Sequence, residues 1–288
     1  MSASKKYYIF GQGISQSLSP VIHNAGFLYH GLPHHYRIQE CPDLDAVRPL
    51  MEDPAFGGSS ITMPHKLSAS KFCDSIADSA TTIGAINTLA VRHGPSNDGA
   101  SGRSIHGDNT DWYGLYSLVT EYLRQNQLDA PVGLVIGAGG AARAGVYALI
   151  RAGVKHIYLA NRTLATAHKV AQDFECLSKV IPVGFPTRLP EAPNLIIGTT
   201  PGQAYPTEAF VDLFQKECGL CIEMAYKPRV THLLAAAMKH TSWVKADGLE
   251  VLLRQAFEQF RLWTGLEPPE AVMRKAVADE IRKREHTL

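Results

Sequence analysis

The feature that most constrains the fold is a glycine-rich turn placed between an apolar stretch and a helical pattern. Val132–Ile136 is a largely apolar run of the kind found in strands buried on both faces. It is followed by Gly137-Ala138-Gly139-Gly140-Ala141-Ala142, which fits the pattern G-x-G-x-x-G/A with Ala142 in the last place. In this pattern the glycines permit a tight turn and a close approach to a pyrophosphate, and the small last residue allows close helix–strand packing. The sequence therefore predicts a Rossmann-like dinucleotide-binding domain; the alternative is a glycine-rich turn that holds no ligand.

Strand and helix patterns alternate on both sides of this turn. After it we expect a helix through Arg151, strands at residues 156–160, 195–197 and 220–224, and a helix at 166–174. Before it we expect strands at 7–10 and 59–63 and helices at 43–51 and 68–78. A further helix opens at Ser19-Pro20, with Ser19 as its N-cap, and ends near Gly31. The alternation predicts an α/β fold with helices packed on parallel sheets.

Two segments bear on the domain organisation. The turn-rich residues 94–102 lie between strand-like segments and predict a hairpin or surface loop, with a linker as the alternative. Residues 249–263 carry apolar side chains at three- and four-residue steps, which predicts an amphipathic helix that Gly265 ends. We expect an N-terminal α/β domain over 1–111, to which 249–288 returns, a Rossmann-like domain over 112–248, and a cleft between the domains.

Composition excludes several classes of protein. With 28 Lys and Arg against 27 Asp and Glu in 288 residues, the chain offers no electrostatic case for nucleic acid. No apolar stretch approaches the ~18 residues of a membrane span, and the N-terminus lacks a secretory segment, so we expect a cytoplasmic protein. The histidines show no ligand spacing and predict no metal site. Cys218-Gly219-Leu220-Cys221 could be redox-active or half a zinc site, but no second pair exists and we interpret it as structural.

The end of the second Rossmann strand indicates the cofactor. NAD sites usually carry a carboxylate about 20 residues past the glycines, whereas this chain reads Asn161-Arg162-Thr163 there. Arg162 can pair with a 2′-phosphate and stack on adenine, which favours NADP over NAD. The alternative is that Arg162 is an ordinary solvated arginine.

Polar clusters in the N-terminal third have no role in core packing. Each lies next to a strand end, where open α/β proteins bind ligands, and together they supply hydroxyls, an amide, an ammonium and a carboxylate. The clusters are Ser15-Gln16-Ser17-Leu18-Ser19-Pro20, Ser60-Ile61-Thr62-Met63-Pro64-His65-Lys66, Gly84-Ala85-Ile86-Asn87-Thr88 and Gly107-Asp108-Asn109-Thr110-Asp111. This set of groups suits a small polyhydroxylated acid.

In these clusters and their order the chain resembles the shikimate dehydrogenase family. The likeness includes S-x-S-P at 17–20, the stretch ending at Lys66, G-A-x-N-T at 84–88, G-D-N-T-D at 107–111, the G-A-G-G-A loop, and Gly248 with Gln255. Residues 31–36, 109–112, 223–228 and 260–265 are similar to the fungal branch, which includes the dehydrogenase domain of the multifunctional shikimate-pathway polypeptide and the quinate-pathway repressor.

The resemblance implies a role for each matching residue. Lys66 and Asp111 would form the acid–base pair for ketone reduction. The implied substrate contacts are Ser17, Ser19 and Tyr226 to the carboxylate, and Thr62, Asn87 and Gln255 to ring hydroxyls. The implied cofactor contacts are Gly137, Ala138, Gly139, Gly140, Ala141, Asn161, Arg162, Thr163, Met224 and Gly248.

Several of these residues have plainer interpretations. Lys66 could be a solvated lysine, Asp111 an N-cap before Trp112, Ser19 only an N-cap, and Gln255 a satisfied core amide. If Gln255 does reach the substrate, the last helix must return to the N-terminal domain.

The chain also departs from the family's pattern. Ser60 replaces the usual Asn, which bears on substrate preference. Pro201, Thr166 and Glu223 also differ, which bears on cofactor affinity.

The resulting hypothesis is an NADP-dependent oxidoreductase that interconverts 3-dehydroshikimate and shikimate as a monomer or homodimer. Quinate is the alternative substrate, and the small side chain of Ser19 favours shikimate, because we expect a bulkier Thr there for quinate. The rival from another class is a ligand-sensing, repressor-like protein without turnover, against which the intact Lys66 and Asp111 argue.

Overall fold

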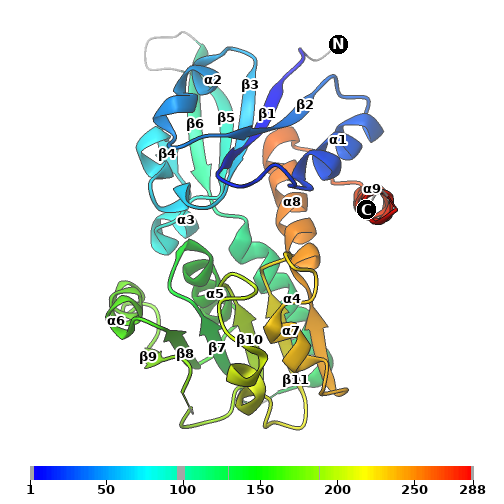
Figure 1. Cartoon of the computed structure of the whole chain (residues 1–288). Helices are drawn as coiled ribbons and strands as arrows, with labels where there is room; N and C mark the ends of the chain where they lie inside the picture. Colours follow the sequence, from blue (N-terminus) through cyan, green and yellow to red (C-terminus); the bar gives the residue numbers. More distant parts are fainter. Residues whose placement is uncertain (1–2, 96–100, 129, 188, 287–288) are drawn as a thin grey trace. The chain divides into compact units, whose positions relative to one another are not determined.

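A computed structural model describes residues 3–95, 101–128, 130–187 and 189–286 (Figure 1). The chain divides into two compact units, one made of Met1–Thr110 with Gln255–Leu288 and the other of Asp111–Arg254. The sequence predicted that the return to the first unit begins at residue 249. The division instead falls inside α8 (Gly248–Thr264), between Arg254 and Gln255. The first turns of α8 stay with the second unit because Arg254 donates hydrogen bonds to Ser117 (3.2 Å) and Glu121 (2.9 Å) on α4 (Asp111–Asn126).

The first unit is built on a six-stranded mixed sheet. Its order is β2-β1-β3-β5-β6-β4, with β1, β2 and β3 parallel and β5 antiparallel to both β3 and β6. The strands are β1 (Lys6–Gly11), β2 (His35–Glu40), β3 (Phe56–Ile61), β4 (Ser75–Ile76), β5 (Thr88–Pro95) and β6 (Ser101–Asp108). The expected hairpin is present as β5 and β6, and residues 96–100 of that turn-rich stretch lie outside the described residues.

Helices pack on this sheet around an apolar core. They are α1 (Ser19–Tyr29), η1 (Asp45–Val47), α2 (Arg48–Glu52), η2 (His65–Leu67), η3 (Ala69–Phe72), α3 (Asp78–Ile83), the rest of α8, and α9 (Glu270–Glu285). Gly26 lets α1 approach α8 and α9 closely, since an added Cβ would lie 2.2 Å from Met273 Cε and 2.8 Å from the Phe260 ring. Figure 1 shows α1 and α9 side by side, as this contact requires. The remaining core includes Phe10, Phe56 and Leu89.

Two local predictions in this unit were wrong. The helix expected over 68–78 is absent; the segment forms η3 and the short β4, which pairs with β6. Its serine and aspartate side chains compete with helical backbone bonds, and the Asp74 carboxylate instead accepts from the Ile105 N–H at 2.7 Å. Ser19 is not an N-cap, because Leu18 occupies that position and the Ser17 hydroxyl accepts the Ser19 N–H at 3.2 Å.

The second unit is a Rossmann-like parallel sheet. Its strand order is β12-β11-β10-β7-β8-β9, which is the 3-2-1-4-5-6 order of dinucleotide-binding folds read from the other edge. The strands are β7 (Val132–Ile136), β8 (His156–Asn161), β9 (Val180–Gly184), β10 (Leu195–Gly198), β11 (Gly219–Glu223) and β12 (Trp243–Ala246). Besides α4 and the first turns of α8, its helices are α5 (Gly140–Arg151), α6 (Leu164–Asp173), η4 (Thr207–Leu213) and α7 (His232–Ala237). The core includes Leu134, Ile196 and Trp243.

Candidate functional site

The polar clusters of the first unit meet at one edge of its sheet. β1 and β3 run parallel, so their carboxyl ends lie together, and Thr62 N–H donates to Phe10 O at 2.9 Å there. Because β5 is antiparallel to β3 and β6 to β5, the start of β5 and the end of β6 reach the same edge. The pairing of Thr88 with both Ser60 and Asp108 fixes this arrangement. Strand direction thus brings segments far apart in the sequence to a single polar edge.

Asn87 is the centre of a buried network at that edge. Its Oδ1 accepts the Thr88 hydroxyl at 2.6 Å and the Thr110 N–H at 2.7 Å. Its Nδ2 donates to Thr110 Oγ1 at 3.0 Å and to Gln255 Oε1 at 3.3 Å. The structure therefore brings Gln255 of α8 to Asn87, as the sequence had led us to expect for a returning helix. Thr88 and Thr110 belong to this network although the sequence did not mark them as site residues.

The serines and Thr62 lie in loops or helix starts that follow strands. Ser17 and Ser19 are buried, and their hydroxyls are 3.2 Å apart. Thr62 directly follows β3, and its Cγ2 is so close to Gly11 that a Cβ there would lie 2.4 Å away. The glycine at the end of β1 thus allows the two loops to pack together. Buried hydroxyls next to open strand ends are suited to bind a ligand carboxylate.

The proposed catalytic pair comes from two different segments. Lys66 is half-buried in η2, and its backbone carbonyl accepts the Ile86 N–H at 2.8 Å, which ties it to the segment before Asn87. Asp111 is buried and begins α4, directly after Thr110. Asp111 and Tyr226 belong to the second unit, whereas Lys66 belongs to the first.

In the second unit the glycine-rich loop has the geometry that a pyrophosphate site needs. Gly137 has φ +119°, and a Cβ there would lie 2.3 Å from Thr199 Oγ1, so the turn after β7 accepts only glycine. Gly139 caps α5 with φ −91°, and a Cβ there would meet no protein atom within 4 Å. The first turn of α5 therefore presents backbone N–H groups beside open space, which fits a dinucleotide phosphate.

A small pocket lies at the end of β8. It has a volume of about 280 Å³, and its lining is Asn161, Arg162, Thr163, Thr200, Pro201, Ala204 and Tyr205. Arg162 is exposed there, and the Asn161 amide donates to the Thr163 carbonyl at 2.9 Å, which fixes the turn. Pro201, one of the departures from the family pattern, forms part of the wall. The pocket can hold a planar base beside a guanidinium.

Met224 and Gly248 also lie together. A Cβ at Gly248 would be 2.8 Å from Met224 O and 2.6 Å from Ala225 O, so only glycine allows this approach. The loop is held by Glu223, whose two carboxylate oxygens accept the Ala225 N–H and the Thr231 hydroxyl, each at 2.9 Å. Burial raises the pKa of Glu223 above its ordinary value. The longer side chain at this departure from the family pattern thus ties down the loop that carries Met224.

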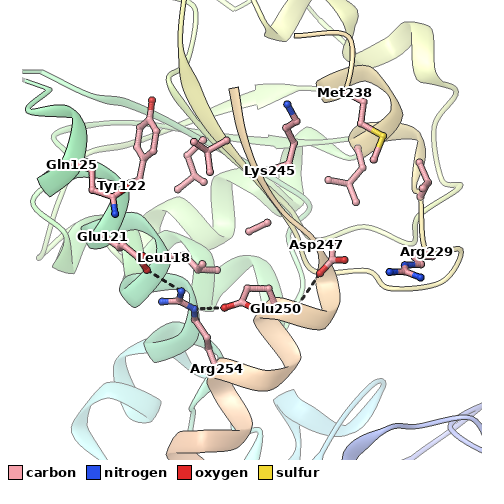
Figure 2. A pocket seen from close by; sticks show the side chains of 15 residues that line it. Leu118, Glu121, Tyr122, Gln125, Arg229, Met238, Lys245, Asp247, Glu250 and Arg254 are labelled. Carbon is pink, nitrogen blue, oxygen red and sulfur yellow. Dashed lines mark hydrogen bonds and ion pairs between the residues drawn. The ribbon is translucent and has the colours of Figure 1, made fainter. Parts of the chain in front are cut away.

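A larger pocket in the second unit contains none of the predicted residues. It has a volume of about 600 Å³ and lies among α4, α7, β12 and the start of α8 (Figure 2). Figure 2 shows that Arg254 faces both Glu121 and Glu250, to which it is bonded at 2.9 and 2.6 Å. Lys245 donates to the His240 carbonyl at 3.0 Å. These charged side chains already form ion pairs and hydrogen bonds within and between the elements around the pocket. The size of the pocket alone therefore does not identify it as a ligand site.

Possible metal ligands, cysteines and apolar helices are the other features of interest in the described part of the chain. No group of three or more His, Cys, Asp or Glu side chains there has the geometry of a metal site. Cys218 and Cys221 are free thiols, and burial raises the pKa of Cys221 in β11. Within the same described ranges, no helix combines the length and the apolar character of a membrane span.

A parallel dinucleotide-type unit joined to a second α/β unit with a polar strand edge is typical of dinucleotide-dependent oxidoreductases. Sequence profiles agree with this class. Residues 9–89 match the shikimate dehydrogenase substrate binding domain, 121–205 match shikimate / quinate 5-dehydrogenase, and 248–278 match the shikimate 5'-dehydrogenase C-terminal domain.

Solved structures extend the match to nearly the whole chain. Shikimate dehydrogenase from Aquifex aeolicus is 31% identical with a TM-score of 0.80, and the alignment covers 96% of this chain and 99% of that one. The dehydroquinate dehydratase and shikimate dehydrogenase portion of S. pombe AroM is 34% identical with a TM-score of 0.78, over 96% of this chain and 53% of that one. The chain belongs to the shikimate dehydrogenase family.

Fungal proteins are among its curated relatives. The pentafunctional AROM polypeptide of Malassezia globosa is 41% identical over 92% of this chain, and the quinate repressor protein of Emericella nidulans is 33% identical over 97%. The chain spans 17% of the length of the first of these relatives and 35% of the second.

Proposed function

We propose that this chain catalyses the reversible, NADP-dependent reduction of 3-dehydroshikimate to shikimate. The observation that carries the proposal is the buried polar edge of the first unit, where Ser17, Ser19, Asn87 and Gln255 are each less than 8% exposed. Buried hydroxyls and amides are costly unless they have hydrogen-bonding partners. A polyhydroxylated acid offers such partners, and family membership supports this choice of ligand.

The cofactor proposal rests on the second unit. The loop at residues 137–141 would hold the pyrophosphate, Asn161, Arg162 and Thr163 the 2′-phosphate and adenine, and Met224 with Gly248 the nicotinamide end. Shikimate dehydrogenases of the same fold have been solved with NADP(H), including that of Thermus thermophilus, and a quinate dehydrogenase from Corynebacterium glutamicum has been solved with NAD. The bound cofactor would supply the hydride, and side chains of this protein would bind the substrate and supply the proton.

The residue roles follow from the chemistry of ketone reduction. The carbonyl oxygen becomes an alkoxide and needs a proton, which Lys66 would donate and, in the reverse direction, accept. Asp111 would orient the Lys66 ammonium and a ring hydroxyl. Ser17, Ser19 and Tyr226 would bind the carboxylate, and Thr62, Asn87 and Gln255 the ring hydroxyls. A site of this kind rejects analogues that leave its polar groups unpaired.

A second candidate function is a ligand sensor without turnover, which the similarity to the quinate repressor protein favours. The retention of both Lys66 and Asp111 favours catalysis. Absorbance at 340 nm separates the candidates when each of shikimate and quinate is supplied with each of NADP and NAD. Turnover with shikimate and NADP supports the proposal, turnover chiefly with quinate reassigns the substrate, and binding without turnover supports the sensor.

A further inference from the structure

A continuous chain of hydrogen bonds runs behind the polar edge and ends on Asn87. The Tyr36 hydroxyl donates to Ser60 Oγ at 2.6 Å, and the Ser60 hydroxyl donates to Gln259 Oε1 at 2.9 Å. Gln259 Nε2 then donates to Thr88 Oγ1 at 2.9 Å, and the Thr88 hydroxyl donates to Asn87 Oδ1 at 2.6 Å. All five side chains are buried in the first unit, and Gln259 and Thr88 are fully buried. In a buried position each such bond is costly to break.

The direction of this chain is fixed at the Asn87 end. Backbone N–H groups only donate, so the Thr110 N–H, 2.7 Å away, identifies the oxygen end of the Asn87 amide. The single hydroxyl proton of Thr88 is therefore given to Asn87 Oδ1, and Thr88 must accept from Gln259. Gln259 meets this need with its amide nitrogen, whose second hydrogen reaches the Asn87 carbonyl at 3.3 Å.

The orientation of Asn87 determines that of Gln255 in turn. Gln255 Oε1 accepts both from Asn87 Nδ2 at 3.3 Å and from the Thr110 hydroxyl at 3.2 Å. The Gln255 amide oxygen is thus turned into the network and its amide nitrogen away from it. A ligand hydroxyl that contacts the Gln255 amide nitrogen would therefore accept a hydrogen bond from it.

We propose that Gln259 is a positioning residue that, through Thr88, reinforces the Asn87 amide orientation given by the Thr110 N–H, and so keeps the Gln255 amide nitrogen as the end that can donate to the substrate. This inference rests on the proposed function, because it takes Asn87 and Gln255 as the groups that bind ring hydroxyls. Ser60 completes the arrangement by accepting from Tyr36 and donating to Gln259. Ser60, which replaces the family's usual Asn, thus has the Gln259 amide of α8 as its hydrogen-bond partner.

Gln259→Glu tests the direction of the chain with almost no change in shape. An ionised carboxylate only accepts, so the Thr88 proton is drawn away from Asn87 Oδ1. We expect about a tenfold rise in KM for shikimate at pH 8.5, the loss of about one hydrogen bond, with an unchanged Kd for NADP.

His23 is a titratable side chain that packs against this chain of hydrogen bonds. His23 stacks on Tyr36 at 4.7 Å and also faces Gln259, and burial lowers the pKa of its imidazole to about 3. A carboxylate at position 259 would raise that pKa, so the variant and the wild type are compared at pH 8.5 alone.

Two further variants separate positioning from folding. Thr88→Val should raise KM for shikimate as Gln259→Glu does, and Thr88→Ser, which keeps the hydroxyl, should raise it much less. Ser75→Ala is the control, since it removes the hydroxyl of an exposed residue that is bonded to the buried His106 at 2.9 Å on an edge strand of the same sheet. It should lower stability slightly and leave KM unchanged.

The outcomes distinguish this inference from the function on which it rests. An active wild type with an unchanged KM for shikimate in folded Gln259→Glu overturns the positioning role alone. If Gln259→Glu does not fold, equal KM values in Thr88→Val and Thr88→Ser overturn it. A wild type that neither turns over nor binds shikimate refutes the proposed function, and the inference falls with it.

Discussion

Replacing Gly139 with alanine separates a requirement of the ligand from a requirement of the fold. An added Cβ meets no protein atom within 4 Å, and φ −91° suits alanine. Alanine is a poorer N-cap than glycine by about 0.5–1 kcal/mol, but it restricts the unfolded chain by a similar ~0.4–1 kcal/mol. The two terms nearly cancel, so we expect Tm to change by no more than about 2 °C.

Cofactor binding should respond much more strongly. If a pyrophosphate lies against the Gly139 backbone, the new methyl group occupies its place, and the loss of one hydrogen bond to a charged phosphate costs about 1.5–3 kcal/mol. We therefore expect the Kd for NADP, measured by calorimetric titration, to rise 10- to 100-fold.

Two other glycines provide the comparison. Gly137→Ala should unfold at a distinctly lower temperature, because its Cβ would lie 2.3 Å from Thr199 Oγ1 at φ +119°. Gly94→Ala, where an added Cβ also meets nothing within 4 Å and which lies on β5 of the first unit, should change neither property. A Gly139→Ala protein with wild-type Tm and wild-type Kd for NADP would refute the assignment of this loop to the pyrophosphate.

Three further changes test other parts of the account. Lys66→Ala should lower kcat for shikimate oxidation by at least 100-fold, in the range of general acid–base catalysis, with an unchanged Kd for NADP; equal kcat values would remove Lys66 from catalysis. Arg162→Ala should lower kcat/KM with NADP by about tenfold, because the lost charge-assisted bond is exposed, and leave NAD unaffected; an equal loss with both cofactors would argue against a 2′-phosphate contact. Burial raises the pKa of the Glu223 carboxyl group above its ordinary 4.5. The folded state therefore keeps this proton to a higher pH than the unfolded state does, and the free energy of unfolding falls as pH rises from 4.5. Glu223→Gln should therefore reduce this slope in urea titrations between pH 4.5 and 7, and an unchanged slope would assign the dependence to other groups.

The local motifs of the site could be predicted from the sequence because their chemistry is carried by neighbouring residues. The turn at residues 137–142 requires small residues at fixed spacing, and its strand and helix lie where the apolar pattern places them. The amphipathic helix around Gln255 is likewise present, and it ends at Gly265 with φ +68°. Such features depend on backbone geometry within one segment.

Features that depend on pairing between distant segments were missed. Nothing in the local sequence around Ser75 predicts that it pairs with β6, so the helix expected there was wrong. β9 and β12 are short edge strands of the second sheet, and their patterns were too brief to read. The role proposed for Gln259 depends on contacts among β3, β5 and α8, which are far apart in the sequence. Its one sequence signal was a second glutamine four residues after Gln255 on an otherwise apolar helix face.

The central claim is that this chain is a catalyst acting on shikimate with NADP, and the most direct test is the initial rate of absorbance increase at 340 nm. Purified protein would be mixed with shikimate and NADP, with the NAD and quinate combinations run in parallel. The account predicts sustained turnover that is fastest with shikimate and NADP and is lost in Lys66→Ala. Binding of NADP and shikimate without turnover in any of the four combinations would contradict it.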